Sequence, residues 1–204
     1  MDKTRRWIIF IILLAILLRV GLFIIAFIHP DRMLDTDSGS YLSPAKYFLN
    51  SGYYSYPGAM RMPLYPVFIA IIFMLFGDHI IYIGLVQILL GICTIYITYK
   101  LGLLLEFSRS ASTISASILS LSLESLISPL YVLTDTFFTF LLILTTYVFI
   151  LYIKRNRLLW LVSASLLTGL VTLCRPIALA FAAMVVVVSV EPESTRTIST
   201  SLIV

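Results

Sequence analysis

Two aspartates, Asp35 and Asp37, stand two residues apart in the segment DTDSGSY (35–41), directly after a long apolar stretch. In an extended loop both carboxylates can reach one divalent cation, because hard cations prefer carboxylate oxygens. Alternatively, one of them can act as a general base toward a hydroxyl group. A third interpretation is a solvated loop in which an aspartate caps the helix that follows. The spacing alone leaves these alternatives open.

Three further charged residues lie where apolar runs begin. Arg61 precedes the run 64–76 and can bind a phosphate through both arms of its guanidinium, or can pair with bulk lipid headgroups. Asp135 starts another run, where the helix macrodipole alone would also favour a carboxylate. Arg175 starts the last run, where the dipole does not stabilise a cation, so we expect it to bind an anion.

Arg19 and Glu124 fall inside apolar runs. Ionisable residues within a membrane are candidate functional residues, but the long side chain of Arg19 can also extend to the interface. We expect Glu124 to pair with Arg19 or with Arg175. The two cysteines, Cys93 and Cys174, lie in or beside apolar runs, and we interpret them as small hydrophobic residues rather than as a disulfide.

The elements that must position these residues are strongly apolar. Of the 204 residues, 60% are hydrophobic and 12% charged, and the mean hydropathy is +1.05. Soluble domains have about 45–50% apolar and about 25% charged residues, so the composition predicts a polytopic membrane protein. The basic residues cluster at the ends of apolar runs, which indicates membrane topology and not a nucleic-acid-binding surface. The sequence has no phosphate-binding glycine loop, dinucleotide fingerprint, zinc-ligand spacing or nucleophile elbow.

The apolar runs are candidate membrane spans, each of which needs about 20 residues. The candidates are residues 7–28, 80–99, 111–133, 137–153, 158–173 and 177–190, of which the last two are short. The run 64–76 has only about a dozen residues, which suits a helix on the membrane surface. The sequence therefore predicts an all-α, polytopic membrane helix bundle of about six spans, with a loop and a juxtamembrane helix between the first two.

The positive-inside rule orients these spans. Basic residues at positions 3, 5 and 6 place the N-terminus in the cytoplasm. If the run 64–76 does not cross the membrane, the basic residues at 100, 109, 154, 155 and 157 lie inside as well; if it crosses, they lie outside. Because basic residues are enriched in cytoplasmic loops, we choose the arrangement in which the run 64–76 does not cross the membrane. In this arrangement the segments 29–62, 133–135 and 173–176 share the outer face of the plasma membrane.

The outer loop carries helix signals of its own. Ser43 followed by Pro44 is typical of a helix start, and the sequence Asn-Ser-Gly at 50–52 is typical of a helix end. Tyrosines at 53, 54, 56 and 65 are expected at the level of the lipid headgroups. The proline and glycine at 57 and 58 predict a turn.

Several short motifs follow one another along the chain. Asp37-Ser-x-x-Tyr41 comes after the first apolar run, and RMPLYP (61–66) opens a run that ends in LFG (75–77). Gln87 lies in the next run, and LTD (133–135) and GLVTLCRP (169–176) come later. In the order and spacing of these motifs, to about residue 190, the chain resembles the GT-C glycosyltransferases that use polyprenyl-phosphate sugars. This group includes relatives of protein O-mannosyltransferases and of lipid A aminoarabinose transferases.

The resemblance implies a reaction and roles for single residues. The implied enzyme moves a sugar from a polyprenyl-phosphate donor to a hydroxyl of a glycan, lipid or protein on the outer face. Asp37 matches the family's catalytic base, and Asp35 is an adjacent acid. Together they are similar to the DxD pattern of metal-using relatives, which implies a divalent cation as an optional cofactor. The substrate-binding residues that the resemblance implies are Arg61, Tyr65, Tyr41, Asp135 and Arg175. The acid that follows the base in the family is Ser38 here.

Members of this family usually continue for hundreds of residues. We therefore interpret residues 1–190 as the N-terminal part of a GT-C transmembrane domain and residues 191–204 as a polar tail at a truncation. Two other interpretations stay open: a transporter or lipid-binding membrane protein, and an inactive remnant that only inserts. The absence of an internal repeat and the gathering of polar residues at one surface argue against a transporter. The expected partners are the lipid-linked donor, the acceptor and membrane lipids, and not nucleic acid.

Overall fold

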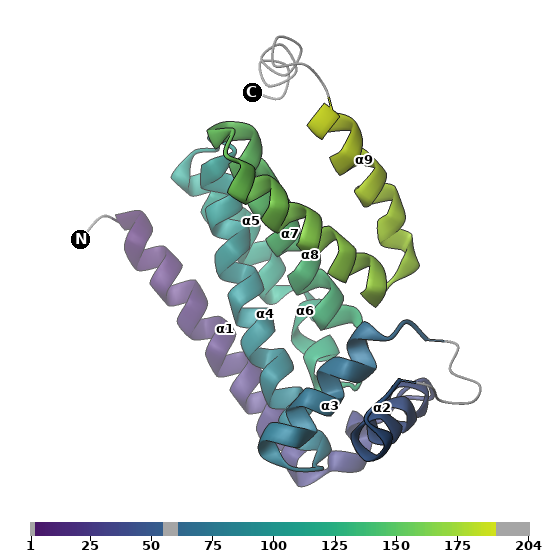
Figure 1. Cartoon of the computed structure of the whole chain (residues 1–204). Helices are drawn as coiled ribbons and strands as arrows, with labels where there is room; N and C mark the ends of the chain where they lie inside the picture. The colour runs from purple at the N-terminus through teal and green to yellow at the C-terminus, as the bar shows by residue number, and fades with distance from the viewer. Residues whose placement is uncertain (1–2, 55–60, 191–204) are drawn as a thin grey trace.

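The computed structural model describes residues 3–54 and 61–190, and the regular secondary structure in both ranges is entirely helical (Figure 1). The predicted all-α class is confirmed. The tail at 191–204, the turn at 57–58 and Tyr56 lie outside the described residues. The helices of the described ranges are α1 (Lys3–Ile28), α2 (Gly39–Ser51), α3 (Leu64–Phe76), α4 (Ile80–Leu104), α5 (Arg109–Leu121), α6 (Leu123–Ile127), α7 (Asp135–Arg155), α8 (Leu158–Cys174) and α9 (Leu179–Val190), with short 3-10 turns η1 (Pro30–Met33), η2 (Ser128–Leu130) and η3 (Pro176–Ala178).

Three of the described helices are long and apolar enough to cross a membrane. They are α1 over Ile9–Ile28, α4 and α7, and α5 with α6 would form a fourth span with a bend of 60°. The helices α3, α8 and α9 have only 13, 17 and 12 residues. The predicted count of about six spans is therefore not confirmed. The long apolar helices support an integral membrane protein.

The stretch 111–133, predicted as one span, is broken in the structure. α5 ends at Leu121, Ser122 has an extended backbone (φ −63°, ψ 135°), and α6 begins at Leu123. The Ser122 hydroxyl accepts a hydrogen bond from Ser125 N (3.4 Å) and so caps α6. The prediction of a continuous span was wrong because serine side chains offer the backbone an alternative to helical hydrogen bonds.

Arg19 fills the break from the neighbouring helix α1. Its side chain is fully buried, and its Nη2 donates to the carbonyl (2.9 Å) and the hydroxyl (2.6 Å) of Ser125. Its Nη1 donates to the carbonyls of Ser120 (3.4 Å) and Ala15 (3.3 Å). The Ser125 carbonyl needs this donor because Pro129, four residues on, has no N–H group. Irregular backbone at membrane depth is tolerated where buried groups satisfy it in this way.

The structure places the side chains of Arg19 and Glu124 differently from the sequence-based expectations. The Arg19 guanidinium lies inside the protein and does not extend to the membrane interface. Glu124 is exposed, and in the part of the chain that the structure describes it forms no ion pair with Arg19 or Arg175. The expected pairing was wrong because the backbone carbonyls freed by the break take the guanidinium instead.

The outer loop forms α2, which begins earlier than its sequence signals suggest. The helix starts at Gly39, directly after the acidic turn, so Pro44 lies inside it and the predicted start at Ser43 was wrong. The cause is local, because Ser40 N and Ser40 Oγ both donate to the Asp37 carbonyl (3.0 and 2.6 Å) and start the helical spiral there. The predicted end is confirmed by Gly52, which has a left-handed backbone (φ 76°) and donates to the Phe48 carbonyl.

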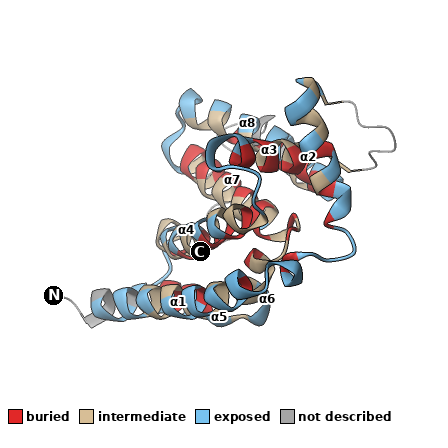
Figure 2. Cartoon of the chain, turned by 90° about the horizontal axis from the view of Figure 1, so that it is seen from below, coloured by how far each residue is buried: buried red, intermediate tan, exposed pale blue. Residues whose placement is uncertain are grey.

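The bundle has two chemically different ends. The start of α1 and the basic connections α4–α5 and α7–α8 lie together in the upper part of Figure 1. Lys154 of α7 pairs with Glu106, which follows α4, and so joins two of these connections. At the other end α2 and α3 pack on each other through buried residues that include Tyr41, Ala45 and Ile69 (Figure 2).

Close contacts between helices depend on small residues of α4. A Cβ atom at Gly102 would lie 2.7 Å from Ser112 Oγ and 3.2 Å from Ser112 Cα on α5. One at Gly84 would lie 2.5 Å from Met33 Cε, at the foot of the loop that carries the acidic turn. Small residues allow helices in membranes to approach closely. These two glycines therefore let α5 and the outer loop pack directly on α4.

Candidate functional site

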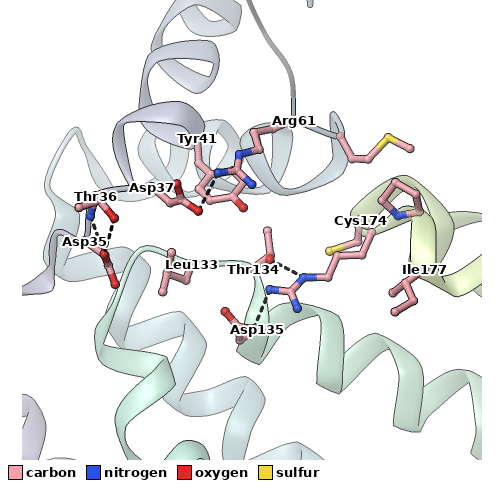
Figure 3. A pocket seen from close by; sticks show the side chains of 13 residues that line it. Asp35, Thr36, Asp37, Tyr41, Arg61, Leu133, Thr134, Asp135, Cys174 and Ile177 are labelled. Carbon is pink, nitrogen blue, oxygen red and sulfur yellow. Dashed lines mark hydrogen bonds and ion pairs between the residues drawn. The ribbon is translucent and has the colours of Figure 1, made fainter.

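A cavity of about 730 Å³ opens at the end of the bundle where α2 and α3 lie (Figure 3). Its walls come from four stretches that are far apart in the sequence: the acidic turn with α2, the segment before α3, the start of α7, and the α8–α9 connection. The residues that line it are Asp35, Thr36, Asp37, Tyr41, Arg61, Met62, Leu133, Thr134, Asp135, Cys174, Arg175, Pro176 and Ile177. Six of the seven predicted site residues therefore meet at one cavity.

One wall carries Asp37 and Arg61. Arg61 Nη2 lies 2.7 Å from Asp37 Oδ2, and Arg61 Nε donates to Ser40 Oγ (3.0 Å). The guanidinium lies over the ring of Tyr41, with its central carbon 5.1 Å from the ring centroid. Tyr41 itself is buried, so the ring is a fixed support for the arginine. This wall thus presents a carboxylate and a guanidinium side by side.

The opposite wall has the same composition. Arg175 Nη2 donates to Asp135 Oδ1 (2.6 Å), and Arg175 Nε donates to Thr134 Oγ1 (2.8 Å). The guanidinium carbon lies 5.3 Å from the ring centroid of Phe138, one turn along α7. Asp135 is the first residue of α7, where the helix dipole favours a carboxylate. Arg175 is thus placed between the ends of two helices, as its position in the sequence suggested.

Both arginines use the same edge of the guanidinium to hold their place. In each, Nε donates to a hydroxyl and Nη2 forms an ion pair with an aspartate, and Nη1 has no partner among the described residues. A guanidinium can bind phosphate or carboxylate oxygens through two donors at once. The cavity therefore combines two anchored arginines with donors left for an anion and two carboxylates that can accept protons or hydroxyl hydrogen bonds.

Asp35 turns away from Asp37 and toward its own loop. Its Oδ1 accepts from Thr36 N (2.6 Å) and from Thr36 Oγ1 (2.9 Å), while Asp37 points to Arg61 (Figure 3). Within residues 3–54 and 61–190 no group of three or more His, Cys, Asp or Glu side chains could hold a metal ion. Oδ2 of Asp37 is already paired with the positive charge of Arg61. The metal stays a prediction, and the chemistry below uses no step through it.

Tyr65 lies behind the cavity and not in its lining. Its side chain is fully buried, its ring packs edge-to-face on Tyr41 (5.2 Å between centroids), and its hydroxyl donates to Gln87 Oε1 (2.8 Å). Burial raises the pKa of the Tyr65 hydroxyl well above its ordinary value, so the group stays protonated and donates. Tyr65 therefore supports the Tyr41–Arg61 wall from the interior.

A family comparison decides the class of protein to which this cavity belongs. A sequence model described as dolichyl-phosphate-mannose-protein mannosyltransferase matches residues 58–204, which is most of the chain. The chain belongs to this mannosyltransferase family. No curated protein and no solved structure matches the chain significantly.

Membership of the mannosyltransferase family confirms the predicted GT-C type of membrane glycosyltransferase. The family also implies, in general terms, a lipid-linked sugar donor and a glycan or protein acceptor. The matched range contains Arg61, Asp135 and Arg175, whereas Asp35 and Asp37 precede it. The structure brings residues from inside and outside the matched range to the same cavity.

The mannosyltransferase-family cavity also uses hydroxyl residues that sequence reasoning missed. Ser40 and Thr134 each fix one of the two arginines; Thr134 directly precedes Asp135 in the sequence, and Ser40 follows Asp37 by three residues. A second, smaller cavity of about 180 Å³ lies on the other side of Asp135, and Glu124 and Ser128 are among its lining residues. Hydroxyl residues are frequent along the chain, so no local signal in the sequence marks Ser40 or Thr134 as a support.

Proposed function

We propose that this chain transfers a sugar from a polyprenyl-phosphate donor to an acceptor hydroxyl on the extracytoplasmic face of the membrane. The acceptor oxygen attacks the anomeric carbon of the sugar, and the bond from that carbon to the phosphate oxygen breaks. The acceptor proton passes to a carboxylate of the cavity, and polyprenyl phosphate leaves with the bonding electron pair. Attack from the side opposite the leaving phosphate inverts the anomeric configuration.

The observation that carries this proposal is the pairing of one acid with one arginine on each of two facing walls. Asp37 is the proposed base, because Oδ1 of its carboxylate has no partner among the described residues and can accept the proton. Asp135 and Tyr41 are the proposed contacts for sugar and acceptor hydroxyls. Asp35, which is bonded to Thr36, shapes the turn that presents Asp37.

Arg175 and Arg61 are the proposed binding groups for the donor phosphate. Negative charge grows on the phosphate oxygen as the sugar leaves, so cations fixed in place before the reaction stabilise the transition state more than the ground state. The hydrogen bonds from Arg175 to Thr134 and Asp135 provide this fixing. A lysine at position 175, with one point charge on a flexible side chain, would bind the donor phosphate more weakly than the arginine.

The apolar surroundings of the cavity suit a lipid-linked donor. Ile177 lines the cavity and is 77% exposed, and Leu173 and Leu179 beside it are exposed as well. These side chains form an apolar strip at the α8–α9 connection, next to Arg175. A polyprenyl chain can lie along such a strip while its phosphate meets the arginine, because the tail gains from contact with apolar surface.

The side of the membrane is proposed from charge. The cavity lies at the end of the bundle away from the α4–α5 and α7–α8 connections (Figure 1), where Lys100 lies near the end of α4, Arg109 begins α5 and Arg157 precedes α8. Cytoplasmic loops are enriched in Lys and Arg, so the cavity end is assigned to the extracytoplasmic side.

Binding of a polyprenyl phosphate to the purified chain tests the donor class. Native mass spectrometry in detergent would compare a polyprenyl phosphate with the polyprenol of the same length, which lacks only the phosphate. We expect the chain to retain the phosphate and not the alcohol, because the proposed recognition is by arginine. Equal retention of both lipids would show that only the tail is bound and would contradict the proposal.

A further inference from the structure

A fully buried polar network lies behind the cavity. Gln87 of α4 and Tyr65 of α3 have 0% of their surface exposed. Tyr65 donates to Gln87 Oε1 (2.8 Å), and Gln87 Nε2 donates to the carbonyls of Pro129 (3.0 Å) and Tyr131 (2.8 Å). The amide of Gln87 thus uses both N–H groups and its oxygen.

The network has one possible direction of hydrogen bonding. Backbone carbonyls only accept, so the amide nitrogen of Gln87 must face Pro129 and Tyr131 and its oxygen must face Tyr65. An apolar side chain of similar size at position 87 would leave the Pro129 carbonyl and the Tyr65 hydroxyl without the partner that Gln87 provides, whereas the Tyr131 carbonyl would keep its hydrogen bond from Leu133 N (2.9 Å). Such unpaired groups are costly in a protein interior, so the network resists rearrangement.

One arm of the network reaches the Asp135–Arg175 wall. Pro129 and Tyr131 belong to the connection between α6 and α7, and Tyr131 stands four residues before Asp135. The same connection is joined to the acidic turn, since Ser38 Oγ donates to the Val132 carbonyl (3.2 Å). A shift at Gln87 would therefore move the start of α7 and the base of the turn together.

The other arm reaches the Asp37–Arg61 wall. The ring of Tyr65 packs edge-to-face on the ring of Tyr41. The guanidinium of Arg61 lies over the same Tyr41 ring, with its central carbon 5.1 Å from the centroid. Tyr41 has only 6% of its surface exposed and is closely packed, so a displacement of the Tyr65 ring would displace Tyr41 and with it Arg61.

We propose that Gln87 is a positioning residue for the cavity, and that it fixes the distance between the two acid–arginine walls. Gln87 does not line the cavity and acts through the α6–α7 connection and through Tyr65. The proposal rests on the proposed function, because the separation of the walls matters for catalysis only if one substrate meets both.

Three variants and a matched control test this role in the full chain. Gln87→Leu removes the network, Tyr65→Phe removes one hydrogen bond, and Gln87→Glu replaces the amide by a group that can donate only when protonated. The control is Thr94→Val, a buried residue of the same helix whose hydroxyl donates to the Leu90 carbonyl of its own helix (2.8 Å).

The expected result is a loss of turnover that follows the hydrogen bonds. Displacing reacting groups by about 1 Å costs on the order of 100-fold in rate, so we expect a kcat loss of that order in Gln87→Leu and a smaller one in Tyr65→Phe. In Gln87→Glu, kcat relative to the unmodified chain should rise as the pH falls, because a protonated carboxyl regains one donor toward the carbonyls. Parallel pH profiles, or a kcat for Gln87→Leu equal to that of Thr94→Val, would overturn the role.

A readout that needs no activity separates this inference from the proposed function. Cys174 is buried beside Arg175 in the same core cluster as Tyr65 and Tyr41. In a Cys93→Ser background, we expect Gln87→Leu to raise the alkylation rate of Cys174 by a maleimide on the order of tenfold, since local opening exposes the thiol. If the unmodified chain transfers no sugar, the proposed function fails, and an unchanged alkylation rate in Gln87→Leu would then overturn the positioning role as well.

Discussion

At the scale of single residues, the cavity depends on how its two arginines are fixed. Arg175 donates hydrogen bonds to Thr134 and Asp135 through one edge of its guanidinium, and Arg61 donates one to Ser40 and forms an ion pair with Asp37 through the same edge. Nη1 of each is left without a partner among the described residues. Geometry of this kind cannot be reproduced by a lysine, which has a single charged point on a flexible chain.

Replacing Arg175 tests its proposed role in donor binding. Loss of hydrogen bonds to a charged ligand is expected to weaken binding of polyprenyl phosphate roughly 10- to 100-fold in Arg175→Gln, and Arg175→Lys should recover only part of this loss. Arg157→Gln, a basic residue at the other end of the bundle, is the control and should bind normally. Full affinity in Arg175→Lys would contradict two-donor recognition.

The sequence predicted the acids and arginines of this cavity but not their supports. Aspartate and arginine are rare in an apolar chain, so Asp37, Asp135 and Arg175 stand out, and their positions at the ends of apolar runs predicted a shared surface. Hydroxyl residues are frequent along the chain, so nothing local separates Thr134 from the others. Tyr65 was expected at the substrate, but its place behind Tyr41 follows only from tertiary packing.

At the scale of elements, the broken helix α5–α6 and its arginine form one unit. Arg19 donates to carbonyls on both sides of the break, at Ser120 and at Ser125. The break itself could not be predicted from hydropathy, because the run 111–133 is apolar enough for a span throughout. Its cause lies in Ser122 and Pro129, which alter backbone hydrogen bonding without altering the hydropathy pattern.

Removing the guanidinium should therefore loosen the break. We expect Arg19→Leu to destabilise the protein by about 1–3 kcal/mol for each carbonyl left buried and unpaired. Thermal unfolding in detergent measures this loss, and hydrogen exchange at residues 120–127 localises it. A melting temperature equal to that of the unmodified chain, with unchanged exchange in α6, would refute the assignment.

Close packing of α4 and α5 gives a second prediction for the elements. A methyl group at Gly102 would meet Ser112, including its Cα atom at 3.2 Å, so Gly102→Ala should cost about 1–3 kcal/mol of stability through overpacking. The control is Gly169→Ala on α8, where a Cβ atom meets nothing within 4 Å. This control should be neutral or stabilising by roughly 1 kcal/mol, because alanine favours the helix. Equal melting temperatures for the two variants would be the contrary result.

At the scale of the whole molecule, the helices separate a basic end from the cavity end (Figure 1). The membrane character followed from composition, since a soluble protein with 60% hydrophobic residues would have to hide too much apolar surface from water. The all-α class followed from the lengths of the apolar runs. The number of spans did not follow, because length and hydropathy cannot separate a short crossing helix from one on the surface. The helix α3 has 13 residues and packs on α2, and its place on the membrane surface stays a prediction.

Cysteine labelling tests the proposed orientation. In a chain without its native cysteines, Asp78→Cys lies at the cavity end and Arg157→Cys at the basic end. A membrane-impermeant maleimide added to intact cells should label the first and not the second, because the basic end is assigned to the cytoplasm. Labelling of the second alone would reverse the orientation.

The central claim is that the two-walled cavity carries glycosyl transfer with Asp37 as the base. The most direct measurement is the rate of sugar transfer from a polyprenyl-phosphate donor by the purified chain and by Asp37→Asn, with Asp78→Asn as the matched control. Asp78 is an exposed acid at the same end that pairs with Lys46 outside the cavity. We expect Asp37→Asn to lose about 100- to 10,000-fold in kcat while it still binds polyprenyl phosphate, and Asp78→Asn to keep its activity. Near-normal transfer by Asp37→Asn would contradict the account.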